Sequence, residues 1–438
     1  MNPLAKELNE IIMNANPNVY QMLSKVGKRL FFPKGILYQS AEAKEKAHRF
    51  NATIGMAIEN NHPMFLPSIM EKIDLEPEKA VTYAPATGVQ ELRNIWKEFM
   101  YKKNPSLKDK KISLPIVTSA ITHGLSVIAD IWIDPGDIII LPDKMWGNYN
   151  LIFSVRKNAH IFTYPLFENN KNFNLKAFSD ILKKLKKQKD KLIIILNFPN
   201  NPTGYSPSIK EAKEIASILI DMANKGTNII LISDDAYFGL IYEENILKES
   251  IFGYLTGEHP KLLSIKLDAA TKEDFVWGFR IGFLTYGSVV EGKNIDIDSL
   301  YNALEKKTAG AIRASISNAN HLGQEILLNA FKANNYLLEK QQKINILKRR
   351  AQEIKRIVNY PKYKEAWEVY PFNSGYFMCI KLKTVNAEKL RMYLLEKYGI
   401  GLISLNDKDL RIAFSCVEEK DISSLFDIIY KAIKELEK

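Results

Sequence analysis

A lysine and an arginine eight residues apart are the first candidates for chemistry in this chain. Lys272 lies in a short polar run between LLSIKL and RIGFLTYG, two stretches predicted as strands, and Arg280 stands between two glycines. In α/β proteins the ends of strands carry the chemistry, and glycine lets backbone approach a ligand closely. The pair indicates a phosphorylated carbonyl compound held as a Schiff base. Two solvated surface charges are the plainer alternative.

Two further motifs place polar side chains at predicted strand ends. The loop NFPNNPTG follows the strand LIIIL and presents Asn200 and Asn201, and the strand NIILIS runs into DDAYFG, which carries Asp234 and Tyr237. A buried acid costs several kcal/mol unless it is paired. The aspartate therefore predicts a cationic partner, with a helix cap or an exposed turn as the alternative.

Three more positions could contact a ligand. TSAITHGL predicts the start of a helix, where the free N–H groups of Ile121 and Thr122 could bind phosphate. Trp146 lies in a loop after another predicted strand, where a core or dimer contact is equally compatible with its type. Gly55, in the loop NATIG, is either a close approach to a ligand or a plain turn glycine.

Repeated short apolar runs between residues 115 and 290 predict the framework that positions these residues. The runs alternate with helical stretches, which is typical of an α/β fold with a mainly parallel, seven-stranded sheet between helices. The two runs beside Lys272 are too close for a crossover helix, so we expect at least one antiparallel pairing. A long helical pattern over residues 319–358, followed by the strands GYFMCIKL and LRIAFSCV, predicts a second, smaller α+β domain.

The composition limits the classes of partner. The 438 residues are 46% hydrophobic and carry a net charge of +11, but the densest lysine run, at 184–191, alternates with leucines like the wet face of a helix. We therefore expect anionic small molecules and no nucleic acid. Cys379 and Cys416 lie in apolar runs and predict neither a disulfide framework nor a metal site. Without a signal segment or an apolar membrane span, a cytoplasmic location is expected.

The order and spacing of NPTG, DDAY and the lysine–arginine pair resemble the aspartate aminotransferase family, the class I and II aminotransferases of fold type I that use pyridoxal 5'-phosphate (PLP). The resemblance extends from NATIG to RIAFSC. It implies a large PLP-binding domain over residues 66–344 and a small domain built from residues 1–65 and 345–438. It also implies ping-pong transfer of an amino group from aspartate or an aromatic amino acid to a 2-oxo acid such as 2-oxoglutarate.

The resemblance implies how PLP is held and used. Lys272 would form the Schiff base and move the proton, Asp234 would keep the pyridine nitrogen protonated, and Trp146 would stack on the ring. Tyr237 and Asn201 would hydrogen-bond the phenolic oxygen of the ring. Lys272, Asp234 and Tyr237 form the implied catalytic set. The phosphate is implied to be bound by Arg280, Ile121, Thr122 and, from the neighbouring subunit of a homodimer, Tyr83.

The resemblance also implies a substrate side of the site. Arg411, in LRIAFSC, matches an arginine that grips the α-carboxylate, and Gly55 would approach the same group. Arg313, in IRASISNAN, resembles the arginine that dicarboxylate-specific members send across the dimer to a distal carboxylate, although a structural role is the alternative. The implied substrate-binding residues are thus Arg411, Gly55, Arg313, Trp146 and Asn201.

Some positions depart from the family pattern. Ala269 stands where family members commonly have a serine that contacts the phosphate, so we expect Thr271 or Ser264 to supply a hydroxyl. Asp268 would repel a phosphate and is expected to face away from it. His123 replaces a small residue, and is either packed or placed beside the ring-stacking tryptophan.

Two other functions fit part of the pattern. A PLP-dependent C–S β-lyase would use the same lysine and Arg411, but it would not need Arg313. A non-catalytic ligand-sensing domain of a transcription regulator would need a helix-turn-helix segment, and none is recognisable before the fold. Transfer of an amino group is therefore the function that the sequence favours.

Overall fold

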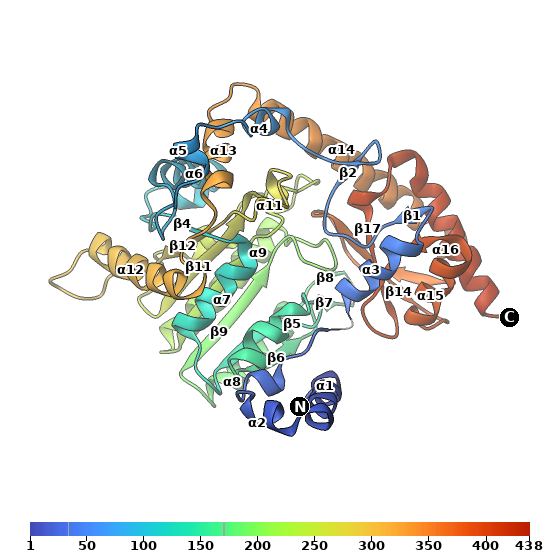
Figure 1. Cartoon of the computed structure of the whole chain (residues 1–438), viewed down its shortest axis with the longest axis horizontal. Coiled ribbons are helices and arrows are strands. Elements are labelled where there is room, and N and C mark those ends of the chain that lie inside the picture. Colours follow the sequence, from blue (N-terminus) through green and yellow to red (C-terminus); the bar gives the residue numbers. More distant parts are fainter. Residues whose placement is uncertain (34, 170) are drawn as a thin grey trace.

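A seven-stranded sheet forms the centre of the computed structural model, which describes residues 1–33, 35–169 and 171–438 (Figure 1). β12 is antiparallel to both of its neighbours, and the other pairings are parallel. The predicted runs and the predicted antiparallel pairing are thus confirmed. In spatial order the strands are β4 (Ile116–Thr118), β12 (Gly282–Gly287), β11 (Leu262–Ala269), β10 (Asn228–Asp234), β9 (Lys191–Asn197), β5 (Ile138–Pro142) and β6 (His160–Tyr164).

Helices cover both faces of this sheet. α7 (Ala120–Trp132) packs with α12 (Ile297–Ser315) on one face, and α8 (Leu175–Lys186) packs with α9 (Ile209–Asn224) on the other. Alternate residues of the central strands belong to two separate hydrophobic cores, because successive side chains of a strand point to opposite faces. This explains why the strand sequences are almost continuously apolar.

The C-terminal part of the chain forms a second, antiparallel sheet covered by α15 (Ala387–Tyr398) and α16 (Ile422–Leu436). β1 (Phe50–Asn51) pairs with β15 (Ile400–Gly401), so a segment from near the N-terminus joins this part. The domain boundaries predicted at residues 66 and 344 remain a prediction. The strands of the second sheet are, in order, β13 (Trp367–Val369), β14 (Phe377–Leu382), β17 (Asp409–Ala413) and β16 (Ile403–Ser404).

The helical pattern over residues 319–358 is two helices, α13 (His321–Phe331) and α14 (Tyr336–Val358). Asn334 and Asn335 lie at the break, and asparagine favours turns over helix interiors. Figure 1 shows α14, in orange, running from the part of the molecule around the seven-stranded sheet to the C-terminal part. It is therefore the helical link between the two sheets.

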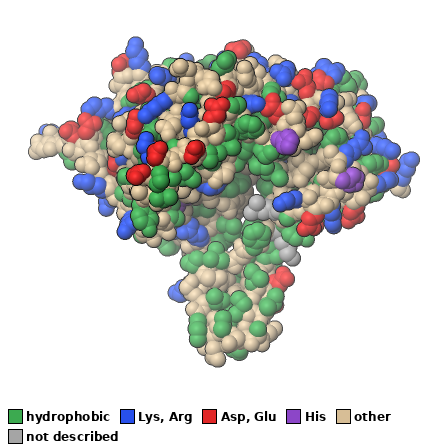
Figure 2. Space-filling model, turned by 45° about the horizontal axis from the view of Figure 1, so that its top comes forward, with side chains coloured by type: hydrophobic (Ala, Val, Ile, Leu, Met, Phe, Trp, Pro, Cys, Tyr) green, Lys and Arg blue, Asp and Glu red, His purple; other side chains and the backbone are tan. Residues whose placement is uncertain are grey.

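Shorter elements complete the fold. The N-terminal helices project from the body of the molecule in Figures 1 and 2, and basic and acidic side chains are interspersed on the face that Figure 2 shows. Across the described ranges, no helix is long and apolar enough to cross a membrane. Besides several 3-10 turns, the α-helices, strands and π-helix not yet given are α1 (Pro3–Ala15), α2 (Pro17–Met22), α3 (Ile36–Lys46), β2 (Ile58–Glu59), β3 (His62–Pro63), α4 (Pro67–Met70), α5 (Pro77–Ala80), α6 (Gln90–Lys103), the π-helix η3 (Asn150–Arg156), β7 (Phe167–Glu168), β8 (Asn172–Phe173), α10 (Ile251–Leu255) and α11 (Ala270–Glu273).

Candidate active site

A cavity of about 320 Å³ lies at the carboxyl ends of β10 and β11, where the two parts of the chain meet. Parallel strands bring their ends to the same edge of a sheet, which is where α/β proteins bind ligands. Ten of the residues predicted from the sequence line it. They are Gly55, Ile121, Thr122, Trp146, Asn201, Asp234, Tyr237, Lys272, Arg280 and Arg411.

Lys272 enters the cavity from α11, the single helical turn that follows β11. Its amine lies 5.1 Å from the centre of the Tyr237 ring. The pKa of Lys272 is lowered to about 8: burial is the largest cause, Asp234 opposes the shift, and Arg280 adds to it. A substantial fraction of the amine is therefore neutral in mildly alkaline solution, the state that a nucleophile or proton acceptor requires.

Asp234 ends β10 and is buried at the floor of the cavity. Tyr149 donates its hydroxyl to Oδ2 at 2.6 Å, and the Ala236 N–H donates to Oδ1 at 3.2 Å. Burial raises the pKa of Asp234 to about 6, and the Tyr149 hydrogen bond works against that rise. Among the residues that the structure describes, none forms an ion pair with this carboxylate. The Lys272 amine acts on it without direct contact and lowers its pKa, so a cationic group of a ligand could still bind here.

The start of α7 and Arg280 bring groups to the cavity that could bind an anion. Ala120, at the start of α7, has φ +58°, and a Cβ on Gly282 would lie 2.8 Å from its carbonyl carbon, so only glycine lets β12 pass this close. The first turn of α7 brings Ile121 and Thr122 to the cavity beside Arg280. Free N–H groups at a helix N-terminus together with a guanidinium suit a phosphate group.

Arg411 lies on β17 and is only 2% exposed. Its guanidinium donates to the side-chain oxygen of Asn201 at 3.1 Å and to the Thr53 carbonyl at 2.7 Å, and it lies 4.2 Å from the centre of the Phe377 ring. Its Nε is buried with no hydrogen-bond partner in the described structure. Because an unsatisfied buried donor is costly, this arginine is suited to receive a carboxylate from a ligand.

Sequence reasoning missed Tyr149. It follows Trp146 by three residues, its ring lies 5.5 Å from the tryptophan ring at 83°, and its hydroxyl reaches Asp234 from a position 85 residues away in the chain. Burial and the adjacent carboxylate raise the pKa of Tyr149 well above its usual value, so it donates and does not ionise. The aromatic pair at this spacing was the available signal.

The residues that depart from the family pattern take defined places. Thr271 lines the cavity, whereas Ser264 does not. Asp268 faces away, as expected, and accepts from Lys266 at 2.6 Å. His123 accepts from the Ser119 N–H and lies 3.0 Å from the Ser315 hydroxyl on α12. Of the two candidate replacements for the missing serine, only the threonine is in reach of the cavity.

Tyr83 and Arg313 lie outside this cavity. Tyr83 is 90% exposed, and Arg313 is exposed on α12, where it donates to the Ser317 hydroxyl. Neither lines the cavity of its own chain. Their contribution across a homodimer therefore stays a prediction.

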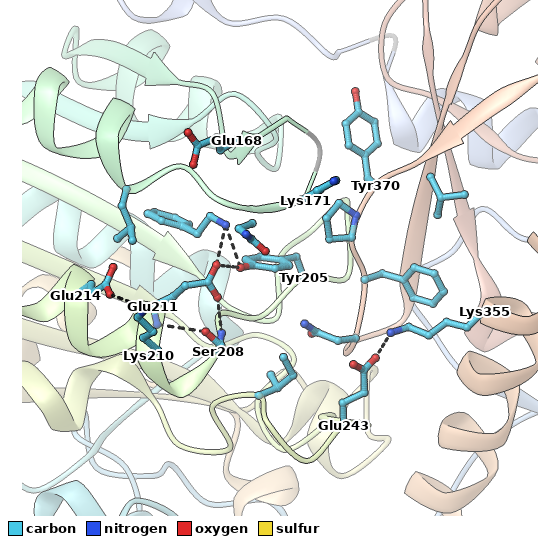
Figure 3. A pocket seen from close by; sticks show the side chains of 18 of the residues that line it. Glu168, Lys171, Tyr205, Ser208, Lys210, Glu211, Glu214, Glu243, Lys355 and Tyr370 are labelled. Atoms are coloured by element: carbon cyan, nitrogen blue, oxygen red, sulfur yellow. Dashed lines mark hydrogen bonds and ion pairs between the residues drawn. The ribbon is translucent and has the colours of Figure 1, made fainter. Parts of the chain in front are cut away.

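A second, larger cavity of about 640 Å³ lies beside α9 (Figure 3). Several of its charged side chains already have partners: Lys355 pairs with Glu243, and Glu211 accepts from the Tyr205 hydroxyl and the Ser208 N–H. None of the residues predicted from the sequence to act on a ligand lines it. The smaller cavity is therefore the candidate active site despite its size.

Comparison with known proteins agrees with this geometry. Residues 53–429 match the family model described as aminotransferase class I and II. The chain belongs to this family. The aspartate aminotransferase of Pyrococcus horikoshii is 28% identical to this aminotransferase over 354 residues, which cover 78% of this chain and 81% of that protein.

Solved structures show the same fold for this aminotransferase. An aminotransferase from Anaerococcus prevotii superposes with a TM-score of 0.81 at 24% identity, covering 93% of this chain and 98% of that one. The kynurenine aminotransferase of Pyrococcus horikoshii superposes with a TM-score of 0.79 at 19% identity, covering 96% and 99%. The predicted fold class, an α/β fold of type I, is thus confirmed.

The lowered pKa of Lys272 makes a prediction about stability. Between pH 8 and 10.5 the unfolded chain holds a proton on this lysine that the folded chain has lost, so stability rises with pH across this window. In protein freed of small molecules, Lys272→Met should stabilise the fold at pH 7 by roughly 2 kcal/mol, after allowance for partial access of solvent. The gain should shrink toward pH 10 in thermal unfolding. Lys189→Met, at an exposed position, is the control; an equal effect there would contradict the prediction.

Proposed function

We propose that this aminotransferase binds PLP through Lys272 and moves amino groups, in a ping-pong cycle, from an L-amino acid to a 2-oxo acid such as 2-oxoglutarate. The observation that carries the proposal is that Lys272, Asp234, Arg280 and Arg411 meet in one cavity. PLP has an aldehyde, a basic ring nitrogen and a phosphate. A lysine of lowered pKa, a buried carboxylate and a helix N-terminus with an arginine match these three groups in type.

Two polar groups of the cavity that have incomplete partners support the match with PLP and an amino acid. The buried carboxylate of Asp234 has hydrogen-bond donors but no ion-pair partner among the described side chains, and the Arg411 Nε has no acceptor. A protonated ring nitrogen would complete the first, and a substrate carboxylate the second. The cavity can therefore bind one cationic group at Asp234 and one carboxylate at Arg411. The cofactor would supply the first group, and an amino acid substrate would supply the second.

When bound, PLP supplies a ring that accepts electrons from the substrate Cα. In this proposal, Asp234 with Tyr149 keeps a proton on the ring nitrogen, Tyr237 and Asn201 act on the phenolic oxygen, and Trp146 packs against the ring. Once the substrate amine has displaced it from the cofactor, the Lys272 amine would take the proton from the substrate Cα and deliver it to the carbon that was the cofactor's aldehyde carbon. Arg411 binds the α-carboxylate, and an apolar enclosure keeps water from the amine.

We propose aspartate or an aromatic amino acid as the donor. Ile36, Ile54, Met56, Trp277 and Phe377 line the cavity and can pack against an aromatic ring. A distal carboxylate would need Arg313 from a partner subunit, as the phosphate would need Tyr83, so we propose a homodimer. The free thiols of Cys379 and Cys416 accord with a cytoplasmic enzyme.

Bound cofactor and amino transfer are tested together by absorbance. The purified protein should have a near-visible absorbance band that is absent from Lys272→Ala. Added L-aspartate or L-phenylalanine alone should shift the band, and 2-oxoglutarate should restore it, because the amino group is stored between the two half-reactions. A protein without the band would contradict the cofactor proposal. Release of a thiol, ammonia and pyruvate from an amino acid that carries sulfur on Cβ, such as L-cystathionine, in the absence of a 2-oxo acid would indicate a C–S β-lyase.

The distal-carboxylate role of Arg313 predicts a selective loss. Arg313→Ala should lower the kcat/KM for aspartate by an amount that corresponds to about 2 to 4 kcal/mol of lost transition-state stabilisation, since a charge pair would be lost. It should leave the kcat/KM for phenylalanine within about threefold of wild type. Steady-state kinetics with both donors measures this. Arg156→Ala, which removes another surface arginine, is the control. Equal losses with both donors would show that Arg313 is structural.

A further inference from the structure

Next to Lys272 lies a largely buried group of four charged side chains that the proposed function does not use. Glu273 and Asp274 follow the lysine in the chain, and their carboxylates pair with Lys340 on α14 and Lys103 on α6. The Lys340 amine is 2.7 Å from Glu273 Oε1 and 2.8 Å from Asp274 Oδ1. We call these four residues the anchor cluster.

The anchor cluster is poorly explained as a source of stability. Its two carboxylates and Lys340 are almost fully buried, and a buried ion pair is often no more stabilising than apolar residues of the same volume. Burial lowers the pKa of Lys340, the two carboxylates raise it, and the net shift is upward, so this lysine stays charged. Tyr336, on the same helix, also donates to Asp274 at 2.5 Å. The directional bonds specify where the turn lies relative to α14.

The same helix holds the other end of the active site. Arg350 lies ten residues after Lys340 on α14, which is about 15 Å along the helix axis. It donates to the carbonyl of Ile58 at 2.7 Å and to the carbonyl of Ser415 at 2.8 Å. Ile58 follows the loop of Gly55, and Ser415 follows the strand that carries Arg411. α14 thus contacts both the turn that bears the amine and the segments that flank the carboxylate-binding guanidinium.

The turn is also held from the second sheet. Tyr376, directly before β14, donates its hydroxyl to the carbonyl of Lys272 at 3.0 Å. The backbone of Lys272 is therefore bonded to the second sheet, whereas the side chains of Glu273 and Asp274 are bonded to α14. A substrate whose carboxylate is bound at Arg411 presents its Cα to the Lys272 amine only if the amine and the guanidinium are the correct distance apart. A displacement of about 1 Å can lower the rate about a hundredfold.

We propose that Glu273 and Asp274 are positioning residues: with Lys340 they tie the turn of Lys272 to α14 and so set the distance between the Lys272 amine and the Arg411 guanidinium. This rests on the proposed function, in which those two groups act on the same substrate. The cluster contains two positive and two negative side chains, so it holds the turn without adding a net charge beside the reactive amine.

The double variant Lys340→Met with Asp274→Asn separates positioning from stability. It removes one charge of each sign, so its thermal midpoint should lie within about 3 °C of wild type. Lys340→Met alone should unfold earlier, because it leaves the buried Asp274 carboxylate without its cation while Glu273 keeps Lys103. In the double variant kcat should fall by about tenfold and KM should change by less than about twofold. The visible circular dichroism of the bound cofactor should also weaken.

Two other residues of α14, Arg349 and Tyr336, provide the control and a second test. Arg349→Met, which breaks an exposed ion pair between α14 and Glu419, should change none of these quantities. Tyr336→Phe, which keeps every charge, should lower kcat by about twofold to threefold and weaken the dichroism, and it tests the inference if the double variant does not fold. Wild-type kcat and dichroism in either folded variant would overturn the inference. A wild-type protein without a visible band would instead overturn the proposed function.

Discussion

The desolvation of the Lys272 amine is the constraint on which the rest of the site depends. A lysine in water keeps its proton far above neutral pH, and burial in the cavity is the largest cause of the lowered pKa of Lys272, about 8. The arrangement around it is consistent with that demand: Arg280 adds to the shift, while Asp234, itself kept near a pKa of about 6 by burial, limits it. The same cavity therefore supplies a reactive amine and an acid that needs a cationic ligand.

The fold meets this constraint by bringing distant segments to one edge. β10 and β11 are parallel neighbours, so Asp234 and the turn of Lys272 emerge side by side. Arg411 comes from a different sheet, and its distance from the lysine is not determined by strand pairing. α14 spans both parts and holds each through a buried basic residue, Lys340 near its start and Arg350 ten residues further along. Rigid helical spacing is a physical means of keeping two halves of a site in register.

Much of this arrangement was predictable from sequence, because it depends on patterns that are local in the chain. The seven apolar runs predicted the strands, and the motifs around Lys272, Asp234 and Arg411 predicted a common cavity. The hydroxyl contact of Tyr149 was not predictable, because it joins positions 85 residues apart. The anchor cluster was hidden for the same reason, since its acids look like an ordinary polar run. Arg313 lies outside the active-site cavity of its own chain, so its predicted contact with a distal carboxylate depends on a second subunit.

The central claim, that Lys272 carries the cofactor, is tested most directly by chemical trapping. The purified protein is reduced with borohydride, digested, and the peptides are identified by mass spectrometry. The account predicts a phosphopyridoxyl group on the peptide that contains Lys272, and none after substitution of that lysine. An adduct on another lysine, or a protein that carries no adduct after incubation with PLP, would contradict the account.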